Sequence, residues 1–484
     1  MAGAAVLRVL AMLAFRPIIW FGGDSASYLA TGLRLVPDPS RVGGYGFLFA
    51  LLRPLHSLAA VAAVQHLAGL AAGVLIYALA RRRRLPGWAA TLAAIPVLFD
   101  AYQVQLESDA VPDVPFCFLV VLALYLLLRS PRQRRPAVVG GAALALGVSA
   151  ILWPVGLALL AVLGVWLLIR RRGWRALAAA VIAGALPVAG YCFFFYLNDH
   201  QFALTRSDGV YLWARTMSFA DCAAIRPPAD ERELCPPPGP RIAASLYIWD
   251  GDSPLLRMPG GRFSARTNAL ALDFALRAIA ARPAGYAAAV AHDTALSFYW
   301  DRPVHPDAAI VDRYQFADAA TAWVPPDMRT PGGGTVAGDQ AAYTGGHPAP
   351  TRAVQPFASW LAGYQRYAYL RGTLLGAILL AGLAGLAVRR RAAAGAGLAW
   401  AFAATILVVP PLVADFDLRY LVPAVPAACL AAALAFAPRP RAAAQRRCTT
   451  SPAATATSGV PDPGATRTSS LPSGSTPAAT PDSG

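Results

Sequence analysis

Charged residues are scarce in this sequence of 484 residues, and lysine is absent. Only 14% of the residues are charged, whereas a soluble domain usually has about 25%. Hydrophobic residues make up 57% of the chain, and its mean hydropathy is +0.47. This composition excludes a soluble globular protein, because so much apolar surface must face something other than water.

The motifs of soluble nucleotide-dependent enzymes are also missing. The sequence has neither the G-x-x-x-x-G-K-[ST] loop that cradles nucleotide phosphates nor the H-E-x-x-H pair of a zinc protease. All 42 basic residues are arginine, and many form short runs between apolar blocks. Nucleic-acid-binding proteins instead gather their basic residues on one face or groove. The net charge of +16 therefore does not indicate a nucleic-acid partner.

Apolar residues are gathered in ten blocks, and a membrane-spanning helix needs about 20 such residues. The blocks lie near residues 4–21, 59–80, 87–100, 111–128, 137–152, 154–169, 174–197, 371–388, 395–413 and 420–437. They predict an all-α polytopic membrane protein with about ten transmembrane helices. Arg16 interrupts the first block and no convincing small-residue cleavage site follows, so we expect an uncleaved helix rather than a signal peptide.

Runs of arginine lie in alternate loops between these blocks. They are Arg81–Arg84, Arg129 with Arg132, Arg134 and Arg135, Arg170–Arg172 with Arg175, Arg389–Arg391, and the basic segment 439–447. Cytoplasmic loops carry the excess of Arg in membrane proteins. We therefore expect a multi-pass plasma-membrane protein with both termini in the cytoplasm.

This orientation divides the chain into four parts. They are an N-terminal membrane domain of about seven helices (1–197, with external loops 22–58 and 101–110), a mixed extracytoplasmic domain (198–370), three C-terminal membrane helices (371–437) and a disordered cytoplasmic tail (438–484). Within the extracytoplasmic domain, residues 266–281 and 283–298 have helical patterns that break at Pro283, and we expect the Gly- and Pro-rich stretch 326–352 to be mobile.

Two of the six cysteines, Cys222 and Cys235, lie in the expected extracytoplasmic domain. An oxidising compartment favours a disulfide between them, and two free thiols are the alternative. Closing so short a loop would add about 3 kcal/mol of stability on the chain-entropy model.

Acidic residues occur in three loops that meet the expected outer surface. Asp24 follows the first block, Glu107 and Asp109 lie in the second external loop before Asp113, and the last loop holds Asp415, Asp417, Arg419 and Tyr420. Carboxylates at a membrane boundary are costly unless they are solvated or paired, so these loops predict a polar cavity built on helix ends.

Each of these acids also has a purely structural interpretation. Asp24 could cap the helix that follows it, Glu107 and Asp109 could be solvated loop residues, and Asp417 could form an interfacial ion pair with Arg419. Within the second apolar block, we expect His66 to make an interhelical hydrogen bond.

The order of these features resembles the GT-C superfamily of membrane glycosyltransferases, particularly the protein O-mannosyltransferases and the aminoarabinose transferases. Residues 20–130 and 410–425 carry the resemblance. The string Asp415–Phe416–Asp417–Leu418–Arg419–Tyr420–Leu421–Val422–Pro423 is similar to a D-x-R-Y-x-x-P pattern of bacterial relatives. Residues 198–370 are typical of an actinobacterial subgroup.

The resemblance implies a GT-C-like fold and sugar transfer from a polyprenyl-phosphate carrier to a cell-envelope glycan, lipid or protein. Asp24 matches the catalytic base, and Arg419 matches the position that faces the leaving phosphate. The other expected substrate-binding residues are Glu107, Asp109, Arg53, Asp417 and Tyr420. No cofactor is implied with certainty, and a divalent metal held by Asp24 and Glu107 stays an alternative.

Two other functions remain open at this point. Relatives often have paired acids in the first loop, where this chain has Asp24 followed by Ser25. A non-catalytic scaffold for cell-envelope glycan assembly is therefore one alternative, and a transporter or flippase for lipid-linked saccharides is the other. The absence of a clear internal repeat and the boundary position of the acids favour the enzyme.

Overall fold

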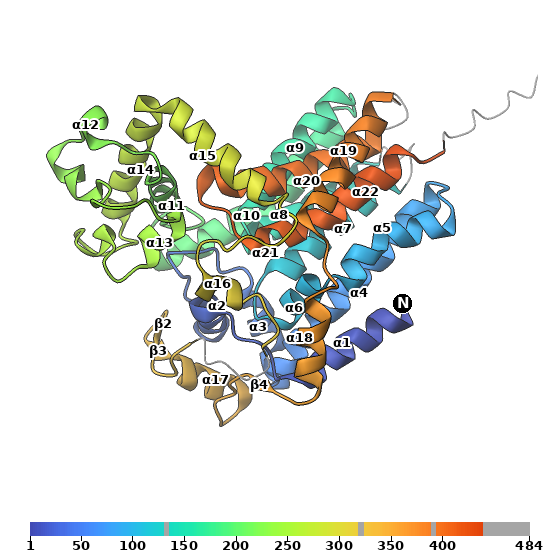
Figure 1. Cartoon of the computed structure of the whole chain (residues 1–484), viewed down its shortest axis with the longest axis horizontal. Helices are drawn as coiled ribbons and strands as arrows, with labels where there is room; N and C mark the ends of the chain where they lie inside the picture. The colour runs from blue at the N-terminus through green and yellow to red at the C-terminus, as the bar shows by residue number, and fades with distance from the viewer. Residues whose placement is uncertain (130–134, 318–323, 389–393, 439–484) are drawn as a thin grey trace, which may run out of the picture. The chain divides into compact units, whose positions relative to one another are not determined.

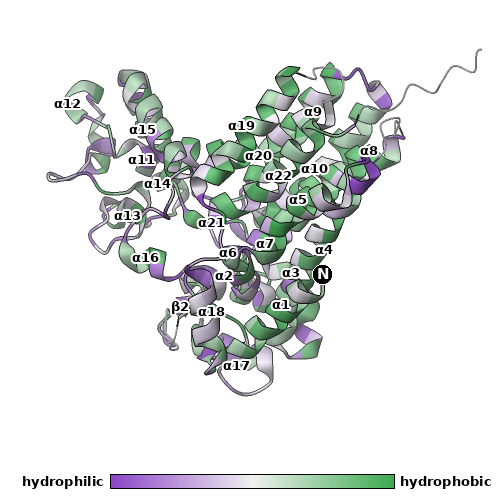
Figure 2. Cartoon of the chain, turned by 45° about the vertical axis from the view of Figure 1, so that its right-hand side comes forward, coloured by the Kyte–Doolittle hydropathy of each residue, from purple (hydrophilic) through white to green (hydrophobic). Residues whose placement is uncertain are grey.

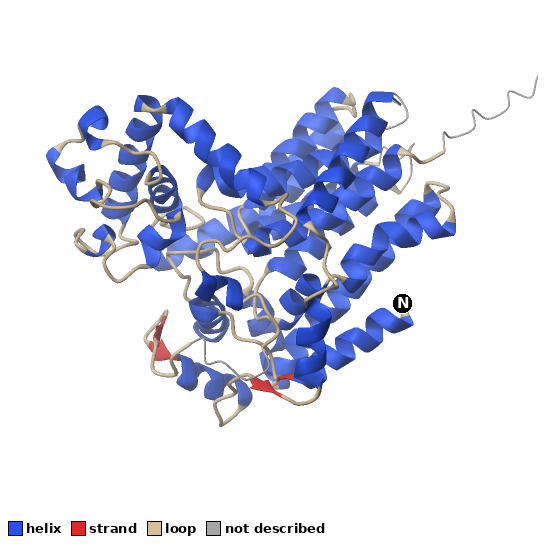
Figure 3. Cartoon of the chain, in the orientation of Figure 1, coloured by secondary structure: helices blue, strands red, loops and turns tan. Residues whose placement is uncertain are grey.

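Helices form almost all of the regular structure (Figures 1 and 3). A computed structural model describes residues 1–129, 135–317, 324–388 and 394–438. The helices of the first 199 residues are α1 (Ala2–Ala14), α2 (Gly22–Arg34), α3 (Gly46–Leu52), η1 (Arg53–Leu55), α4 (Leu58–Arg82), α5 (Gly87–Phe99), α6 (Ala101–Ser108), α7 (Asp113–Leu128), α8 (Pro136–Leu152), α9 (Val155–Ile169) and α10 (Trp174–Asp199).

Segment 198–370 is also mainly helical. It contains α11 (Asp208–Thr216), α12 (Cys222–Ile225), η2 (Ala229–Leu234), α13 (Ala244–Trp249), η3 (Pro254–Leu256), α14 (Ala265–Ala281), α15 (Pro283–Leu296), α16 (Ala308–Asp312), α17 (Val336–Thr344) and α18 (Phe357–Gln365). The chain continues through α19 (Gly372–Val388), α20 (Ala394–Val413), α21 (Leu418–Leu421), η4 (Val422–Ala424) and α22 (Val425–Ala435). The strands are two antiparallel pairs, β1 (Phe15–Arg16) with β4 (Arg352–Ala353) and β2 (Arg329–Thr330) with β3 (Gly334–Thr335).

Each of the ten predicted apolar blocks contains a helix. In the described part of the chain, four helices are long and apolar enough to cross a membrane alone: Leu58–Arg82, Trp174–Asp199, Gly395–Val413 and Leu418–Ala435. The pair α5 and α6, bent by 47°, makes a fifth candidate if it counts as one span. The other blocks form shorter apolar helices, α1, α7, α8, α9 and α19. The chain is therefore a membrane protein with several candidate spans, and Figure 2 shows the hydrophobic residues concentrated on these helices.

Arginine-bearing ends of several of these helices lie together. Arg83 Nε donates to the carbonyl of Leu128 at 2.8 Å, which joins the run after α4 to the end of α7. Gly395, at the start of α20, lies beside the side chains of both residues. Arg172, after α9, lines a small pocket with residues of the end of α7 and the start of α8. The runs at Arg389–Arg391 and 439–447 lie outside the described residues.

The first helix ends earlier than the apolar block predicts. The block continues to residue 21, but α1 ends at Ala14 and the chain becomes extended. Pro17 has no N–H group and restricts the residue before it, which ends the helix. The extended chain pairs instead with the residues around the end of α6. The carbonyl of Ile19 accepts the N–H of Ala110, and the N–H of Ile19 donates to the carbonyl of Ser108.

Segment 101–110, expected as an external loop, is largely a buried helix. Asp100 caps α6 by accepting the N–H groups of Tyr102 (2.8 Å) and Gln103 (3.3 Å). All residues of α6 are buried, because the helix packs against α1, α4 and α18. One interpretation expected the polar residues of this stretch to be exposed to solvent. Inside the protein, Gln103 instead donates to Glu107 and Gln105 donates to Asp109.

Segment 198–370 partly follows its predictions. Helices α14 and α15 meet at Pro283 as expected. The structure pairs Cys222 with Cys235 in a disulfide, with 6.1 Å between the Cα atoms. The stretch 326–352, expected to be mobile, contains β2, β3 and α17. Arg34 of α2 holds α17 in place through Asp339, at 2.5 and 2.8 Å.

Candidate functional site

Asp24 lies between two guanidinium groups that come from distant parts of the chain. One carboxylate oxygen, Oδ1, pairs with Arg41, and the other, Oδ2, receives Nη1 of Arg419 at 3.0 Å. The Asp24 side chain is 22% exposed and each arginine side chain is 15% exposed. The carboxylate is thus partly exposed and held by two donors.

The start of α2 explains the position of Asp24. Gly22 has a φ of +55°, a left-handed conformation that glycine adopts without strain, and this residue begins the helix. Asp24 lies in the first turn, yet it makes no capping hydrogen bond to the helix. Both of its oxygens face arginine instead, so the capping interpretation does not account for it.

Arg41 is positioned by the first loop and by segment 198–370. Its Nε donates to Ser40 Oγ at 3.1 Å and lies 3.8 Å from Asp38. Its guanidinium lies over the indole of Trp249, 5.5 Å from the ring centroid. The sequence alone gave no reason to prefer Arg41 over the other arginines near it.

Arg419 is held by aromatic rings and by Asp417. The guanidinium lies 5.3 Å from the ring centroids of both Phe21 and Tyr420. Asp417 caps α21 by accepting the N–H of Arg419 at 3.2 Å, and its Oδ2 lies 3.9 Å from Arg419 Nε. Burial raises the pKa of Asp417, and the charge of Arg419 opposes that rise. Within the described residues, the buried Nε of Arg419 has no hydrogen-bond partner.

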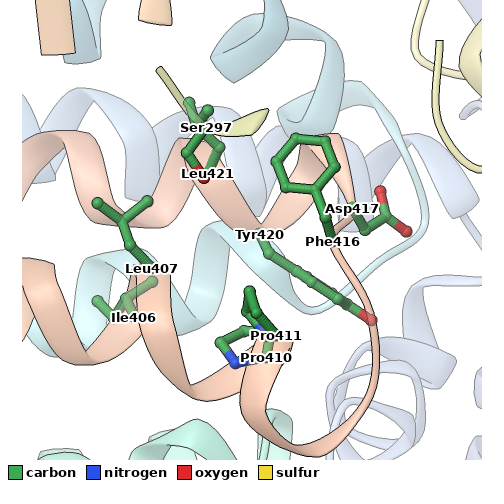
Figure 4. Close-up of a pocket in the computed structure, with 9 residues that line it drawn as sticks. All are labelled: Ser297, Ile406, Leu407, Pro410, Pro411, Phe416, Asp417, Tyr420 and Leu421. Atoms are coloured by element: carbon green, nitrogen blue, oxygen red, sulfur yellow. The ribbon is translucent and has the colours of Figure 1, made fainter. Parts of the chain in front are cut away.

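A small apolar pocket opens beside this arginine (Figure 4). Its lining residues are Ser297, Ile406, Leu407, Pro410, Pro411, Phe416, Asp417, Tyr420 and Leu421. Figure 4 shows Asp417 at the opposite end from Ile406 and Leu407. Tyr420 also stacks on Trp153, with ring centroids 4.8 Å apart. The pocket therefore combines an apolar interior with a charged rim.

Asp415 ties the same loop to segment 198–370. Its Oδ1 accepts from His305 Nε2 at 2.7 Å, and its Oδ2 accepts from the backbone N–H and the hydroxyl of Ser245 at 3.0 and 3.1 Å. Burial alone would raise the pKa of Asp415, but the hydrogen bond and charge of His305 outweigh it and lower this pKa. Burial alone would lower the pKa of His305, but the bond to Asp415 raises it above its usual value.

These two shifts predict a pH-dependent stability. The raised pKa of His305 contributes stability that is complete below about pH 6.5 and is lost as pH rises through the shifted value. The lowered pKa of Asp415 contributes stability that is complete above about pH 3.9 and is lost in stronger acid. We expect His305→Gln to lower the melting temperature by a few degrees between these limits, and by less at pH 8 and above.

The matched control is His292→Gln, because His292 also pairs with an aspartate but is 67% exposed. Surface pairs contribute little, so this variant is expected to melt like the wild type at every pH. An equal loss for His305→Gln at pH 5.5 and pH 9 would contradict the assignment.

Glu107 does not belong to this site, contrary to its expected role in substrate binding. Its side chain is fully buried. It accepts from Arg8 through two hydrogen bonds of 2.8 Å, from His66 at 2.9 Å and from Gln103 at 3.0 Å. Gly69 makes room for it, since a Cβ there would lie 1.9 Å from Glu107 Oε1. The network links α1, α4 and α6, and His66 makes the interhelical bond expected of it.

Asp109 and Asp113, which lie between α6 and the first turn of α7, are both buried. Asp109 is 0% exposed and Asp113 is 5% exposed. One oxygen of each, Asp109 Oδ1 and Asp113 Oδ2, has no hydrogen-bond partner within the described part of the chain. Burial raises the pKa of Asp109 well above its usual value, Asp113 raises it further, and Arg419 opposes the rise. Asp109 is thus not the solvated loop residue that one interpretation expected.

Arg53 lies away from Asp24. It is exposed in η1, where its Nη1 is 3.4 Å from the carbonyl of Leu33. Leu33 is nine residues after Asp24 on α2, about 14 Å along the helix axis. Arg53 is therefore not a second guanidinium at Asp24, and Arg41 occupies that position.

Asp24 and Glu107 do not fit the alternative of a shared divalent metal. The oxygens of Asp24 face Arg41 and Arg419, and those of Glu107 face Arg8 and His66. Across residues 1–129, 135–317, 324–388 and 394–438, no three His, Cys, Asp or Glu side chains gather in a group that could hold a metal ion.

Comparison with known families agrees with the sequence prediction. Residues 46–152 match the dolichyl-phosphate-mannose-protein mannosyltransferase family. The match confirms the resemblance to these membrane glycosyltransferases. It also confirms the predicted enzyme class. Asp24 and the loop that contains Arg419 lie outside the matched residues, and no curated protein sequence matches the chain significantly.

Two solved membrane enzymes show a distant likeness. ArnT from Cupriavidus metallidurans, bound to undecaprenyl phosphate, is 13% identical, with a TM-score of 0.35 over 90% of this chain and 76% of that chain. The oligosaccharyltransferase of Archaeoglobus fulgidus, tethered to an acceptor peptide, is 13% identical, with a TM-score of 0.38 over 89% of this chain and 49% of that chain. These scores are too low to support an argument about shared fold or activity.

Proposed function

We propose that this protein transfers a sugar from a polyprenyl-phosphate carrier to a cell-envelope acceptor, with Asp24 as the general base. The observation that carries the proposal is the Asp24 carboxylate between the guanidinium groups of Arg41 and Arg419. It combines a proton acceptor with two phosphate-binding groups in one accessible place. The match of residues 46–152 supports the same class of reaction.

The reaction needs both kinds of group. The bond between the sugar C1 and the phosphate oxygen breaks, and a bond from C1 to the acceptor oxygen forms. The acceptor hydroxyl gives its proton to Asp24, a task for which a positioned carboxylate is suited. Negative charge grows on the departing phosphate, and fixed cations lower the energy of that state.

Arg419 is well suited to the departing phosphate. Guanidinium binds phosphate oxygens through paired, planar donors. Arg419 already gives Nη1 to Asp24, while its Nε has no partner within the described residues. A phosphate oxygen would satisfy this donor. The neighbours of Arg419 in the chain, Asp417 and Tyr420, line a small apolar pocket.

We propose that about ten helices cross the membrane in a GT-C-like arrangement with both termini in the cytoplasm. The shared location of the arginines after α4 and α9 and the ends of α7 and α8 supports one cytoplasmic end for these helices. In this orientation Asp24 and Arg419 lie at the outer ends, with segment 198–370 outside. Cys222 and Cys235 would then form their disulfide in an oxidising compartment.

Replacement of Arg419 tests the phosphate assignment. We expect Arg419→Ala to lower kcat by about 10²- to 10³-fold, because a donor aimed at developing charge is removed. Arg419→Lys should recover only part of the rate, since a point charge cannot replace a planar pair of donors. The assay uses purified full-length protein in nanodiscs, a panel of polyprenyl-phosphate hexoses and pentoses, and mass spectrometry of the glycoside product.

The matched control is Arg371→Ala. Arg371 also lies over aromatic rings, those of Tyr369 and Trp300, and pairs with Asp301. The Arg371→Ala variant should transfer sugar at the wild-type rate. Full activity of Arg419→Ala would remove the phosphate assignment, and a wild-type protein inactive with every donor would remove the proposed function.

A further inference from the structure

Helix α13 of segment 198–370 contacts the loops of the candidate site at two points. Near its start, Ser245 donates two hydrogen bonds to Asp415, two residues before Asp417. At its end, Trp249 lies under the guanidinium of Arg41. Ser245 and Trp249 are four residues apart, so they lie on the same face of the helix. That face spans the distance between the two loops that supply Arg41 and Arg419.

Trp249 is unusual among these contacts because it remains accessible. The residue is 42% exposed, although Arg41 lies over its ring and Phe263 packs against it with centroids 5.5 Å apart. The partly exposed indole of Trp249 thus lies next to Arg41, which forms an ion pair with Asp24. Exposed carboxylates, Asp250 and Asp252, follow it directly.

This combination matches the chemistry of a sugar ring. One face of a pyranose or furanose carries C–H groups that pack on the electron-rich face of an aromatic ring, and its edge carries hydroxyls that donate to carboxylates. A peptide acceptor would be expected to add to an exposed sheet edge or lie in a helix-binding groove. The strands in the described part of the chain are only two residues long, so they give a peptide little edge on which to pair.

We propose that Trp249, with Asp250 and Asp252, forms the subsite for a carbohydrate acceptor. The inference rests on the proposed transferase function and names the acceptor class. Trp249 stacks on the sugar that precedes the reacting residue, so that the reacting hydroxyl reaches Asp24 beside Arg41. Segment 198–370 thereby selects the acceptor, while Arg419 holds the donor phosphate.

The test compares Trp249→Ala, Trp249→Phe and Trp300→Ala in the full-length protein. Trp300 is the matched control, because it is 55% exposed and lies 5.5 Å from the guanidinium of Arg371. Three rates are measured with the donor that the wild type uses: transfer to octyl disaccharides of a hexose and a pentose, transfer to a Ser/Thr-containing peptide, and hydrolysis of the donor without acceptor.

For Trp249→Ala we expect the KM for the octyl disaccharide to rise about tenfold. The KM for the donor and the rate of its hydrolysis should not change, Trp249→Phe should keep most of the affinity, and Trp300→Ala should behave as wild type. An unchanged disaccharide KM, an equal loss of donor hydrolysis, or transfer to the peptide but to neither disaccharide would each overturn the inference. All of these outcomes require an active wild type, so they are distinct from failure of the proposed function.

Discussion

Asp24→Asn is expected to reduce sugar transfer by about 10²- to 10⁴-fold, the usual contribution of a general base. Asparagine keeps the size of the side chain, but only its carbonyl oxygen accepts a hydrogen bond, so it can keep one of the two arginine contacts and cannot take the proton of the acceptor hydroxyl. The KM for the donor should change little, because both arginines remain. The measurement is kcat and KM for purified protein in nanodiscs, with thermal melting as the check on folding.

The matched control for this variant is Asp339→Asn. Asp339 also forms an arginine ion pair with α2, through Arg34, at the end of the helix away from Asp24. Loss of this carboxylate should leave transfer close to wild type. An Asp24→Asn protein that keeps most of its activity would show that another group accepts the proton.

Glu107→Ala is expected to lower the free energy of unfolding by about 3–5 kcal/mol, because it leaves the buried Arg8 without its partner. The Arg8 side chain is 3% exposed and cannot move into water without loss of its hydrogen bonds to the carbonyls of Val97 and Leu98 in α5. Thermal melting in detergent, with ligand-free protein, measures the loss. The same variant should retain transfer when it is assayed well below its melting temperature, because Glu107 does not contact the site.

The exposed pair Glu233 and Arg257 provides the control, with side chains 60% and 62% exposed. Glu233→Ala should change stability by less than about 1 kcal/mol. The double variant Arg8→Met with Glu107→Leu should recover much of the stability, since an apolar pair often replaces a buried ion pair without loss. A Glu107→Ala protein as stable as Glu233→Ala would contradict the proposed role of the network.

The membrane helices could be predicted from the sequence because their signal is local. The length and composition of an apolar block can be read from that stretch of sequence alone. Helices α4, α10 and α20 lie close to where their blocks predict them. The break between α14 and α15 is equally local, because Pro283 lacks a backbone N–H. The early end of α1 was missed, although Arg16 and Pro17 lie at that point in the sequence.

The site residues could be predicted only in part, because their partners lie far away in the chain. Asp24 and Arg419 were expected to meet through a resemblance, and 395 positions separate them. Glu107 was expected to bind substrate in an external loop, with a solvated loop residue as the alternative. Its partners, Arg8 and His66, are 99 and 41 positions away. No local pattern shows that these residues meet inside the protein.

The sequence also failed to identify Arg41 as a residue of the site. Arg34, Arg41 and Arg53 all follow Asp24 in the chain, and Arg53 was the one expected to bind substrate. The structure directs Arg34 to Asp339, Arg53 to the end of α2, and Arg41 to Asp24. Trp249 was likewise hidden, because only the position of α13 brings it beside Arg41.

The proposed reaction transfers a sugar from a lipid phosphate, whereas a transporter or flippase would move the intact lipid-linked sugar. The most direct measurement reconstitutes the wild-type protein in sealed vesicles with a labelled polyprenyl-phosphate sugar and an octyl disaccharide, and follows the glycoside and the free polyprenyl phosphate together. Both products should appear in equal amounts, and Asp24→Asn should form neither at an appreciable rate. Movement of the labelled lipid between leaflets, with no release of polyprenyl phosphate, would overturn the proposed transfer.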